Sequence, residues 1–256
     1  MTPQRAFAMK EFREFYRTWR IWVLLMPILV FAIGGPIFTY YVPEILDTAL
    51  ETYSDGTISV SVPEPTWIDS YLQWARNLKL VVPLMLLVIA GSAIAGEVVS
   101  GSAIPILTGG LSRRDFILIK FAIISAMGIA SITIGTLINW IVGRMLFPEM
   151  RFIGVVAIIG VASLLALALN ALAILASTFM PDALSAIGME MIIFMLLSLT
   201  TLWSTARRYS PAGLLNSITD LARTGEAEFL APAISTIAIT IVLMAGAVTI
   251  FERREL

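Results

Sequence analysis

Few side chains of this 256-residue sequence could carry out chemistry within its apolar segments. The chain has no cysteine and no histidine, which excludes disulfides, thiolate nucleophiles, zinc sites built from these ligands and Ser-His-Asp catalysis. An aspartyl-type intramembrane protease needs two acids at membrane depth. Glu190 is the one acid embedded in a long apolar segment. We therefore expect no enzyme activity and no metal site in this chain by itself.

Glu190 lies about two helical turns into its apolar segment. A carboxylate is unfavourable at that depth unless it faces a partner, water or a cavity. Three interpretations are open: the side chain extends to the interface, it donates an interhelical hydrogen bond when protonated, or it takes part in the passage of a substrate or proton. Asn139 and Asn170 are the other conspicuous polar residues of the apolar segments, and they complete the predicted intramembrane polar set.

The remaining sequence predicts the elements that position these residues. Hydrophobic residues make up 58% of the chain, charged residues 14%, and the mean hydropathy is +0.89, so there is too little polar surface for a water-soluble globule. Six apolar runs each reach the ~18 residues that cross a bilayer as a helix: Ile21 to Val42, Leu78 to Ala95, Phe116 to Val142, Phe152 to Phe179, Ala183 to Thr205 and Ala231 to Phe251. We predict an all-α integral membrane protein with one domain, 1–256, and six transmembrane helices.

Charge bias predicts the orientation. Basic residues concentrate in residues 1–20, in the connection 96–115 that we expect between the second and third spans, and at the C-terminus. The connection predicted over 43–77 has six acids and no Lys or Arg before Arg76. Both termini are therefore expected on the cytoplasmic side. Arg207, Arg208 and Arg223, in the predicted external segment 206–230, depart from this bias.

Three polar connections have patterns of their own. Residues 1–20 predict a cytoplasmic amphipathic interfacial helix, because two stripes run side by side with helical spacing; the alternative is a basic anchor that only fixes topology. The apolar stripe is Met9, Phe12, Tyr16 and Trp19, and the basic stripe is Lys10, Arg13, Arg17 and Arg20. In the external segment 43–77, "ISVSV" predicts a short strand, and Trp67, Tyr71 and Trp74 predict a helix on the membrane surface. In 206–230, Leu214, Leu215, Ile218 and Leu221 predict a short amphipathic helix at the outer surface.

The connection 96–115 carries the most distinctive motif. Glu97 is followed by Gly101 and Ser102, then by a short apolar stretch and by "LSRRDFILIK". An ordinary loop is one interpretation. The motif also resembles the cytoplasmic loop of the permease subunits of ATP-binding-cassette exporters of the type-2 class. "KEFREFYRTWR", "YSPAGLLNSI" and "FERREL" are similar to that family's interfacial helix, its surface helices before the last span and its basic ending.

This resemblance implies a mechanism and partners. The connection would form a coupling helix that docks on a cytoplasmic ATPase, and two permease chains, identical or related, would enclose a substrate path in a prokaryotic plasma membrane. It assigns six residues to coupling or its support: Glu97, Gly101, Ser102, Arg113, Arg114 and, in the turn before the fifth span, Asp182. None of the three lysines follows a glycine, so the chain lacks a phosphate-binding P-loop. ATP and Mg are expected on the partner, and no cofactor on this chain.

Two other function classes remain. One is a secondary transporter or channel that uses Glu190, although we find neither inverted repeats nor further intramembrane charges. The other is a non-transporting assembly subunit driven by an ATPase. For an exporter, the sparse intramembrane charge favours a small amphipathic or lipid-like cargo over a polar ion. Membrane lipid is an expected partner, and no basic stripe indicates nucleic acid.

Overall fold

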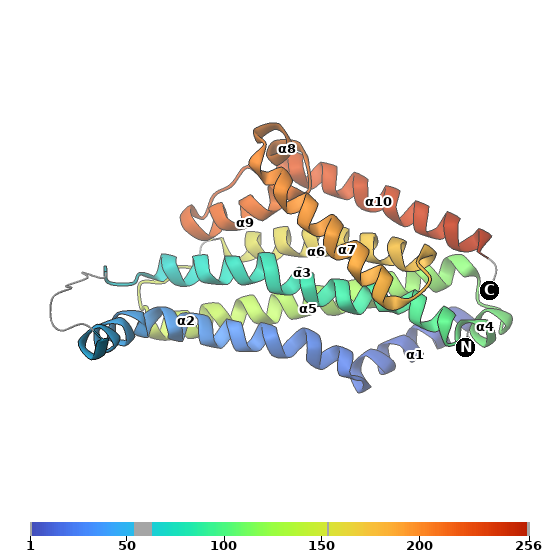
Figure 1. Ribbon diagram of the computed structural model, residues 1–256, viewed down its shortest axis with the longest axis horizontal. Helices are drawn as coiled ribbons and strands as arrows, with labels where there is room; N and C mark the ends of the chain where they lie inside the picture. Colours follow the sequence, from blue (N-terminus) through green and yellow to red (C-terminus); the bar gives the residue numbers. More distant parts are fainter. Residues whose placement is uncertain (1, 54–62, 153, 255–256) are drawn as a thin grey trace.

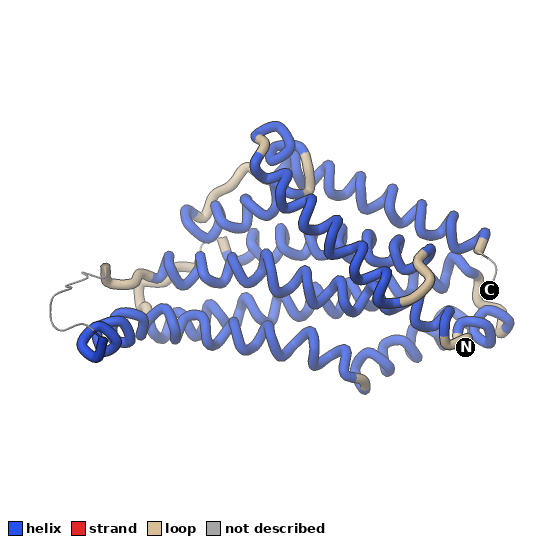
Figure 2. Tube along the Cα trace, viewed as in Figure 1, coloured by secondary structure: helices blue, strands red, loops and turns tan. Residues whose placement is uncertain are grey.

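The computed structural model describes residues 2–53, 63–152 and 154–254, and every regular element in these ranges is a helix (Figures 1 and 2). Six helices are long and apolar enough to cross a membrane: α2 (Trp19–Tyr53), α3 (Trp67–Val99), α5 (Arg113–Leu146), α6 (Val155–Phe179), α7 (Ala183–Leu199) and α10 (Leu230–Arg253). The prediction of six spans in an all-helical, multi-pass membrane protein is confirmed.

Helices α3 and α6 form the centre of the bundle. They pack against each other, α2 and α5 pair beside them, α7 lies on α3 and α6, and α10 lies on α6 and α5. Helices α2 and α5 approach closely at Gly135 of α5. A Cβ atom at this position would clash with the Ile28 side chain of α2, so only glycine fits there. The start of α1 (Pro3–Arg17), helix α4 (Ala103–Thr108) and the end of α10 lie at the same end of the bundle (Figure 1). We call this end the α4 end.

The connection between the first two spans is more helical than the sequence predicted. Helix α2 continues to Tyr53, and α3 begins at Trp67, where Thr66 and Asp69 form a capping box. The prediction of a helix on the membrane surface is wrong, because Tyr71 and Trp74 are buried inside the bundle. The Tyr71 hydroxyl donates a hydrogen bond to the carbonyl of Arg151 (2.7 Å), and the Trp74 indole donates one to Thr136 (3.2 Å). The predicted strand, residues 58–62, lies outside the described residues.

Short helices also join the fifth and sixth spans. A 3₁₀ turn, η1 (Thr200–Leu202), is followed by α8 (Ser204–Tyr209) and α9 (Ala212–Thr224). Helix α9 carries the predicted apolar stripe, but Leu214, Ile218 and Leu221 are buried against α3 and α6 rather than facing lipid. The apolar stripe therefore packs α9 against the bundle, where its side chains are buried by protein instead of lipid.

Candidate functional site

Helix α1 is fastened to the bundle by an aromatic face at the α4 end. Phe7, Glu11 and Phe15 recur every four residues and are buried, because α1 packs against α5. The ring of Phe7 stacks on Phe116 of α5 (5.3 Å between centroids), and Phe116 stacks on Phe251 of α10 (5.4 Å). The stripe predicted to contact lipid is exposed: Met9, Phe12 and Tyr16 lie on α1, and Trp19 is the first residue of α2.

A cluster of six charged residues surrounds this contact, with three cations and three anions. We call it the α1 charge cluster; its members are Lys10, Glu11, Glu14, Arg20, Glu97 and Lys120. The Lys120 ammonium lies 3.0 Å from carboxylate oxygens of both Glu11 and Glu97. The Lys10 ammonium lies 2.8 Å from Glu11, 2.9 Å from Glu14 and 3.1 Å from Glu97. The cluster joins α1, the start of α2, the end of α3 and the start of α5.

Burial disfavours the charged forms of Lys10 and Glu11, and their close pairing with opposite charges outweighs this effect. Lys120 has no exposed surface and its ammonium lies over the Phe116 ring, 5.1 Å from the centroid. Burial alone would lower the pKa of Lys10, but hydrogen bonds to Glu11 and Glu14 raise that pKa above its ordinary value. Burial alone would raise the pKa of Glu11, but the charge of Lys120 and the contacts with Lys10 lower it. The pairing therefore favours the charged forms of Lys10 and Glu11.

The cluster could also be considered as a cation site. Oxygens of Glu11, Glu14 and Glu97 lie within 4.8 Å of one another. The ammonium groups of Lys10 and Lys120 already occupy the position among them, because each lies about 3 Å from two or more of these carboxylates. The arrangement is therefore a network of ion pairs, and its chemical role is to hold α1, α2, α3 and α5 together.

Helix α4 follows directly from this cluster. Glu97 lies in the last turn of α3, and Gly101 ends that helix with φ +71°, a left-handed conformation that glycine adopts without strain. The hydroxyl of Ser102 lies 2.9 Å from that of Ser100 and donates a hydrogen bond to the Glu97 carbonyl (3.4 Å). Ile104 of α4 is about half exposed. Three predicted coupling residues, Glu97, Gly101 and Ser102, are thus brought together where α4 begins.

The other predicted coupling residues have internal contacts or lie apart. Arg113 donates hydrogen bonds to the carbonyls of Phe251 (3.1 Å) and Glu252 (3.0 Å), so it caps the end of α10 instead of facing outward. Asp182 caps α7 by accepting hydrogen bonds from the Ser185 hydroxyl (2.6 Å) and the Ser185 amide (2.9 Å), and these hydrogen bonds lower the pKa of Asp182. Arg114 is exposed and makes no ion pair within the described part of the chain.

The basic stripe of α1 divides in the same way. Lys10 reaches Glu97, which is the packing expected from the resemblance, and Arg20 pairs with Glu14 at 3.4 Å. Arg13 and Arg17 are exposed. Half of the stripe therefore serves the charge cluster, and the other half is available to a phosphate-bearing surface or a protein partner.

The three predicted intramembrane polar residues do not form one site. Asn139 donates a hydrogen bond from α5 to the carbonyl of Ala32 in α2 (3.3 Å). Asn170 donates from α6 to the carbonyl of Phe121 (3.1 Å) and to the hydroxyl of Ser125 (2.6 Å), both in α5. Each asparagine therefore ties one pair of helices together.

Glu190 lies apart from both, in the contact between α7 and α3. The residue is fully buried, so the interpretation that it extends to the interface is wrong. Its carboxyl group lies directly over Gly91, where an added Cβ would come within 2.8 Å of both carboxyl oxygens. Neither oxygen has a hydrogen-bond partner among the described residues. The structure therefore gives no support to an interhelical hydrogen bond.

A serine of α6 hydrogen-bonds to the backbone of α3 beneath Glu190. The hydroxyl of Ser177 accepts from the amides of Ile94 (3.1 Å) and Ala95 (2.8 Å) and donates to the carbonyl of Gly91 (2.7 Å). A side chain inserted into the helical ladder in this way marks a point where a helix can bend. The Glu190 carboxyl group thus lies over the turn of α3 whose Gly91 carbonyl accepts a hydrogen bond from Ser177.

Sequence reasoning missed Glu11, Lys120 and Ser177. Lys120 carries a readable signal, because a lysine several residues inside an apolar run is a functional or paired residue by default. Glu11 shows a weaker one, since it stands between Phe7 and Phe15 at four-residue spacing. Ser177 shows none, because a serine in an apolar helix is commonplace.

Residues 50–256 match the family model described as "Protein of unknown function (DUF2705)", and the chain belongs to this family. The matched region includes α3 to α10, with Glu97, Lys120 and Glu190, whereas α1 and most of α2 precede it. No curated protein matches the chain.

Proposed function

We propose that this member of the DUF2705 family is the permease subunit of an ATP-binding-cassette exporter of the type-2 class. In this proposal a second permease copy, identical or related, completes the substrate path, and a separate cytoplasmic ATPase subunit docks on α4. The ordered resemblance of four sequence segments supports it. The six span-capable helices and a short helix between the second and third spans are compatible with it.

One observation carries the proposal: within the α1 charge cluster, Glu97 links the base of α4 directly to α1 and α5. Glu97 precedes α4 by six residues and contacts Lys10 of α1 and Lys120 of α5 at 3.1 and 3.0 Å. Separating buried charges from their partners is strongly unfavourable. A displacement of α4 by a partner would therefore be passed to α1 and α5 rather than absorbed in the connection.

The residue roles follow from this arrangement. Exposed Ile104 on α4 would contact the ATPase, while Glu97, Gly101 and Ser102 fix the base of α4 and Arg113 supports the neighbouring end of α10. Asp182 would hold the turn before α7 for a secondary contact. ATP and Mg belong to the partner subunit, since the chain has no P-loop. The α4 end would face the cytoplasm of a prokaryotic cell.

The second permease copy and the cargo are proposed on general grounds. Helix α7 buries only a narrow stripe, Ala186, Glu190 and Phe194, and exposes large apolar side chains on its remaining faces. Such a helix can face lipid or the other permease. The few charges at membrane depth favour a small amphipathic or lipid-like cargo.

The test is whether α4 holds an ATPase. We expect a tagged chain to co-purify with a nucleotide-binding subunit from its native membrane. Ile104→Asp should abolish this association, because it places a charge on the exposed apolar contact. Leu202→Asp is the matched control, because Leu202 is also an exposed apolar residue but lies just after the C-terminal end of α7. This variant should retain the ATPase subunit. Equal recovery of the ATPase with both variants would remove α4 from the proposal.

A second candidate is a secondary transporter or channel, favoured by the unpartnered carboxyl group of Glu190. It predicts ion flux in liposomes that contain this chain alone, without ATP, and loss of that flux in Glu190→Gln. The exporter proposal predicts no flux in that preparation. An ATPase-bound assembly subunit would be distinguished by ATP hydrolysis without movement of any cargo.

A further inference from the structure

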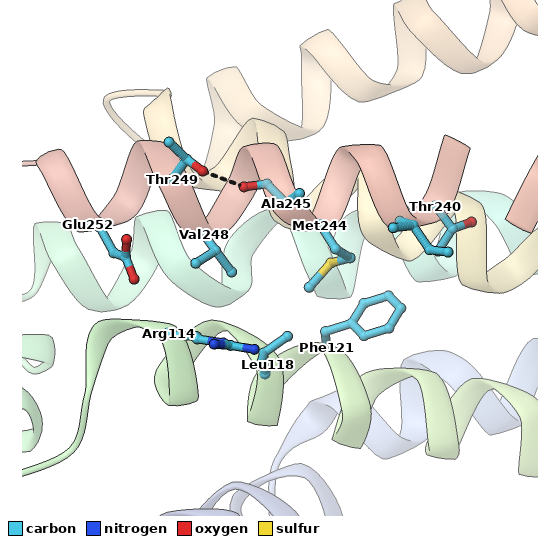
Figure 3. A pocket seen from close by; sticks show the side chains of 10 residues that line it. Arg114, Leu118, Phe121, Thr240, Met244, Ala245, Val248, Thr249 and Glu252 are labelled. Atoms are coloured by element: carbon cyan, nitrogen blue, oxygen red, sulfur yellow. Dashed lines mark hydrogen bonds between the residues drawn. The ribbon is translucent and has the colours of Figure 1, made fainter. Parts of the chain in front are cut away.

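A groove separates α5 from α10 on the outside of the bundle. Its volume is about 600 Å³, and both walls come from span-capable helices. Leu118 and Phe121 line it from α5, and Met244 and Val248 line it from α10 (Figure 3). Because Leu118 and the neighbouring Ile241 are exposed, the groove opens toward the surroundings of the bundle. In a membrane, those surroundings are lipid.

Two opposite charges stand at one end of the groove. Figure 3 shows Arg114 and Glu252 at this end, and Phe121 and Thr240 at the other. Both charged residues are exposed, and neither side chain makes an ion pair or hydrogen bond within residues 2–53, 63–152 and 154–254. They belong to the α4 end, where α5 begins and α10 ends. The groove therefore offers one cation and one anion at the level where a span leaves the hydrocarbon.

The rest of the groove presents apolar surface. Its two threonines do not change this, because the hydroxyl of Thr240 donates to the carbonyl of Thr236 (2.7 Å) and that of Thr249 donates to the carbonyl of Ala245 (2.8 Å). From Thr240 to Glu252 the α10 wall is about 18 Å long at 1.5 Å per residue. One leaflet of hydrocarbon is about 15 Å thick. The groove thus has the length of a single lipid leaflet.

We propose that this groove binds a zwitterionic phospholipid with a primary ammonium headgroup. The Arg114 guanidinium would receive the lipid phosphate, Glu252 would accept hydrogen bonds from the headgroup ammonium, and one acyl chain would lie along Leu118, Phe121, Met244 and Val248. An anionic lipid without an ammonium group would leave the Glu252 carboxylate without a partner, and its negative charge would repel that carboxylate. This inference is independent of the transport function proposed above, because it concerns the chain and its lipid alone.

The experiment is lipid competition in native mass spectrometry. The purified chain, stripped of lipid in detergent, receives phosphatidylethanolamine, phosphatidylglycerol and phosphatidylcholine with matched acyl chains at equal concentration. Wild-type protein should retain one phosphatidylethanolamine about tenfold better than phosphatidylglycerol, the factor of one charge-assisted hydrogen bond. Phosphatidylcholine should bind less well, because its quaternary ammonium has no N–H to donate. Free phosphoethanolamine should not bind, since it lacks the acyl chains.

Three variants make the test specific. Glu252→Gln should abolish the preference for phosphatidylethanolamine over phosphatidylglycerol, and Arg114→Gln should weaken both lipids about tenfold. Arg253→Gln removes an exposed neighbouring charge that does not line the groove, and it should behave as wild type. Equal retention of the two lipids by wild-type protein would overturn the proposal. So would a dimer that binds no lipid and separates in Arg114→Gln, because a second copy would then occupy the groove.

Discussion

The ammonium of Lys120 lies 3.0 Å from a carboxylate oxygen of Glu97, and these two residues bracket α4 in the sequence. The pair closes the connection that contains α4 and fixes both of its ends to the bundle. Neither residue is accessible, since Lys120 is fully buried and Glu97 nearly so. The ion pair therefore fixes the connection that contains α4 to the bundle at Glu97 and at Lys120.

Replacing Lys120 should destabilise the protein strongly. Lys120→Met keeps the side-chain volume but leaves Glu11 and Glu97 without their buried cation, and such a loss typically costs about 3–5 kcal/mol. Arg17→Gln, at an exposed position of α1 without an ion pair among the described residues, should change the free energy of unfolding by less than about 0.5 kcal/mol. Denaturant unfolding in detergent measures both variants. Equal effects would show that the cluster is not a stabilising network.

The stability of the contact between α1 and the bundle should be constant at intermediate pH and fall at both extremes of pH. The pKa of Glu11 is lowered from 4.5 by the charge of Lys120, against the effect of burial, so its contribution is complete above pH 4.5 and lost as pH falls through the lowered value. The pKa of Lys10 is raised from 10.5, so its contribution is complete below pH 10.5 and lost at higher pH. Between about pH 3 and pH 8, the sensitivity of α1 to protease should rise only at the acidic end. Glu11→Gln should remove this acidic rise; an unchanged profile would contradict the assignment.

Glu190 and Gly91 should be energetically linked. Gly91→Ala places a Cβ within 2.8 Å of the Glu190 carboxyl oxygens, and overpacking of this kind destabilises by about 1–3 kcal/mol. In a Glu190→Ala background the same substitution should be tolerated, because the obstructing carboxyl group is gone. Thermal unfolding of the two single variants and the double variant forms a complete mutant cycle. Additive effects would place the carboxyl group away from Gly91.

Arg113 should protect the end of α10. Arg113→Ala removes the donors to the carbonyls of Phe251 and Glu252, so cleavage by trypsin near Arg253 should become several-fold faster, about three- to tenfold, as the last turn opens more often. Arg5→Ala, at an exposed position on α1, is the control and should leave the cleavage rate unchanged. Because Arg113 has this internal role, a combined replacement of Arg113 and Arg114 would not isolate coupling.

The spans were predictable because length and hydropathy alone decide which segments enter a membrane. Their ends were not. Tyr71 and Trp74 have the spacing and amphipathic character of interfacial residues, yet they are buried because Thr136 and the carbonyl of Arg151 satisfy their polar atoms inside the bundle. Helix α9 shows the same effect, since its apolar face packs against other helices where contact with lipid was expected.

The site was only partly predictable. Glu97 was assigned by resemblance and Lys10 by the helical spacing of the basic stripe, and the structure brings their charged groups within 3.1 Å. The opposing cation, Lys120, contacts both Glu97 at the end of α3 and Glu11 of α1. Glu11 lies 109 residues before Lys120 in the sequence, and no local pattern encodes a contact at that separation. The role of Arg113 was similarly hidden, because its acceptors are backbone carbonyls at the far end of the chain.

We propose that α4 docks on a separate ATPase subunit, and this docking can be tested directly. The most direct measurement is native mass spectrometry of the tagged chain purified from its own membrane in mild detergent. We expect two copies of a permease and two copies of a nucleotide-binding subunit, with the latter lost in Ile104→Asp. Recovery of this chain alone, or as a homo-oligomer without any nucleotide-binding protein, would contradict the account.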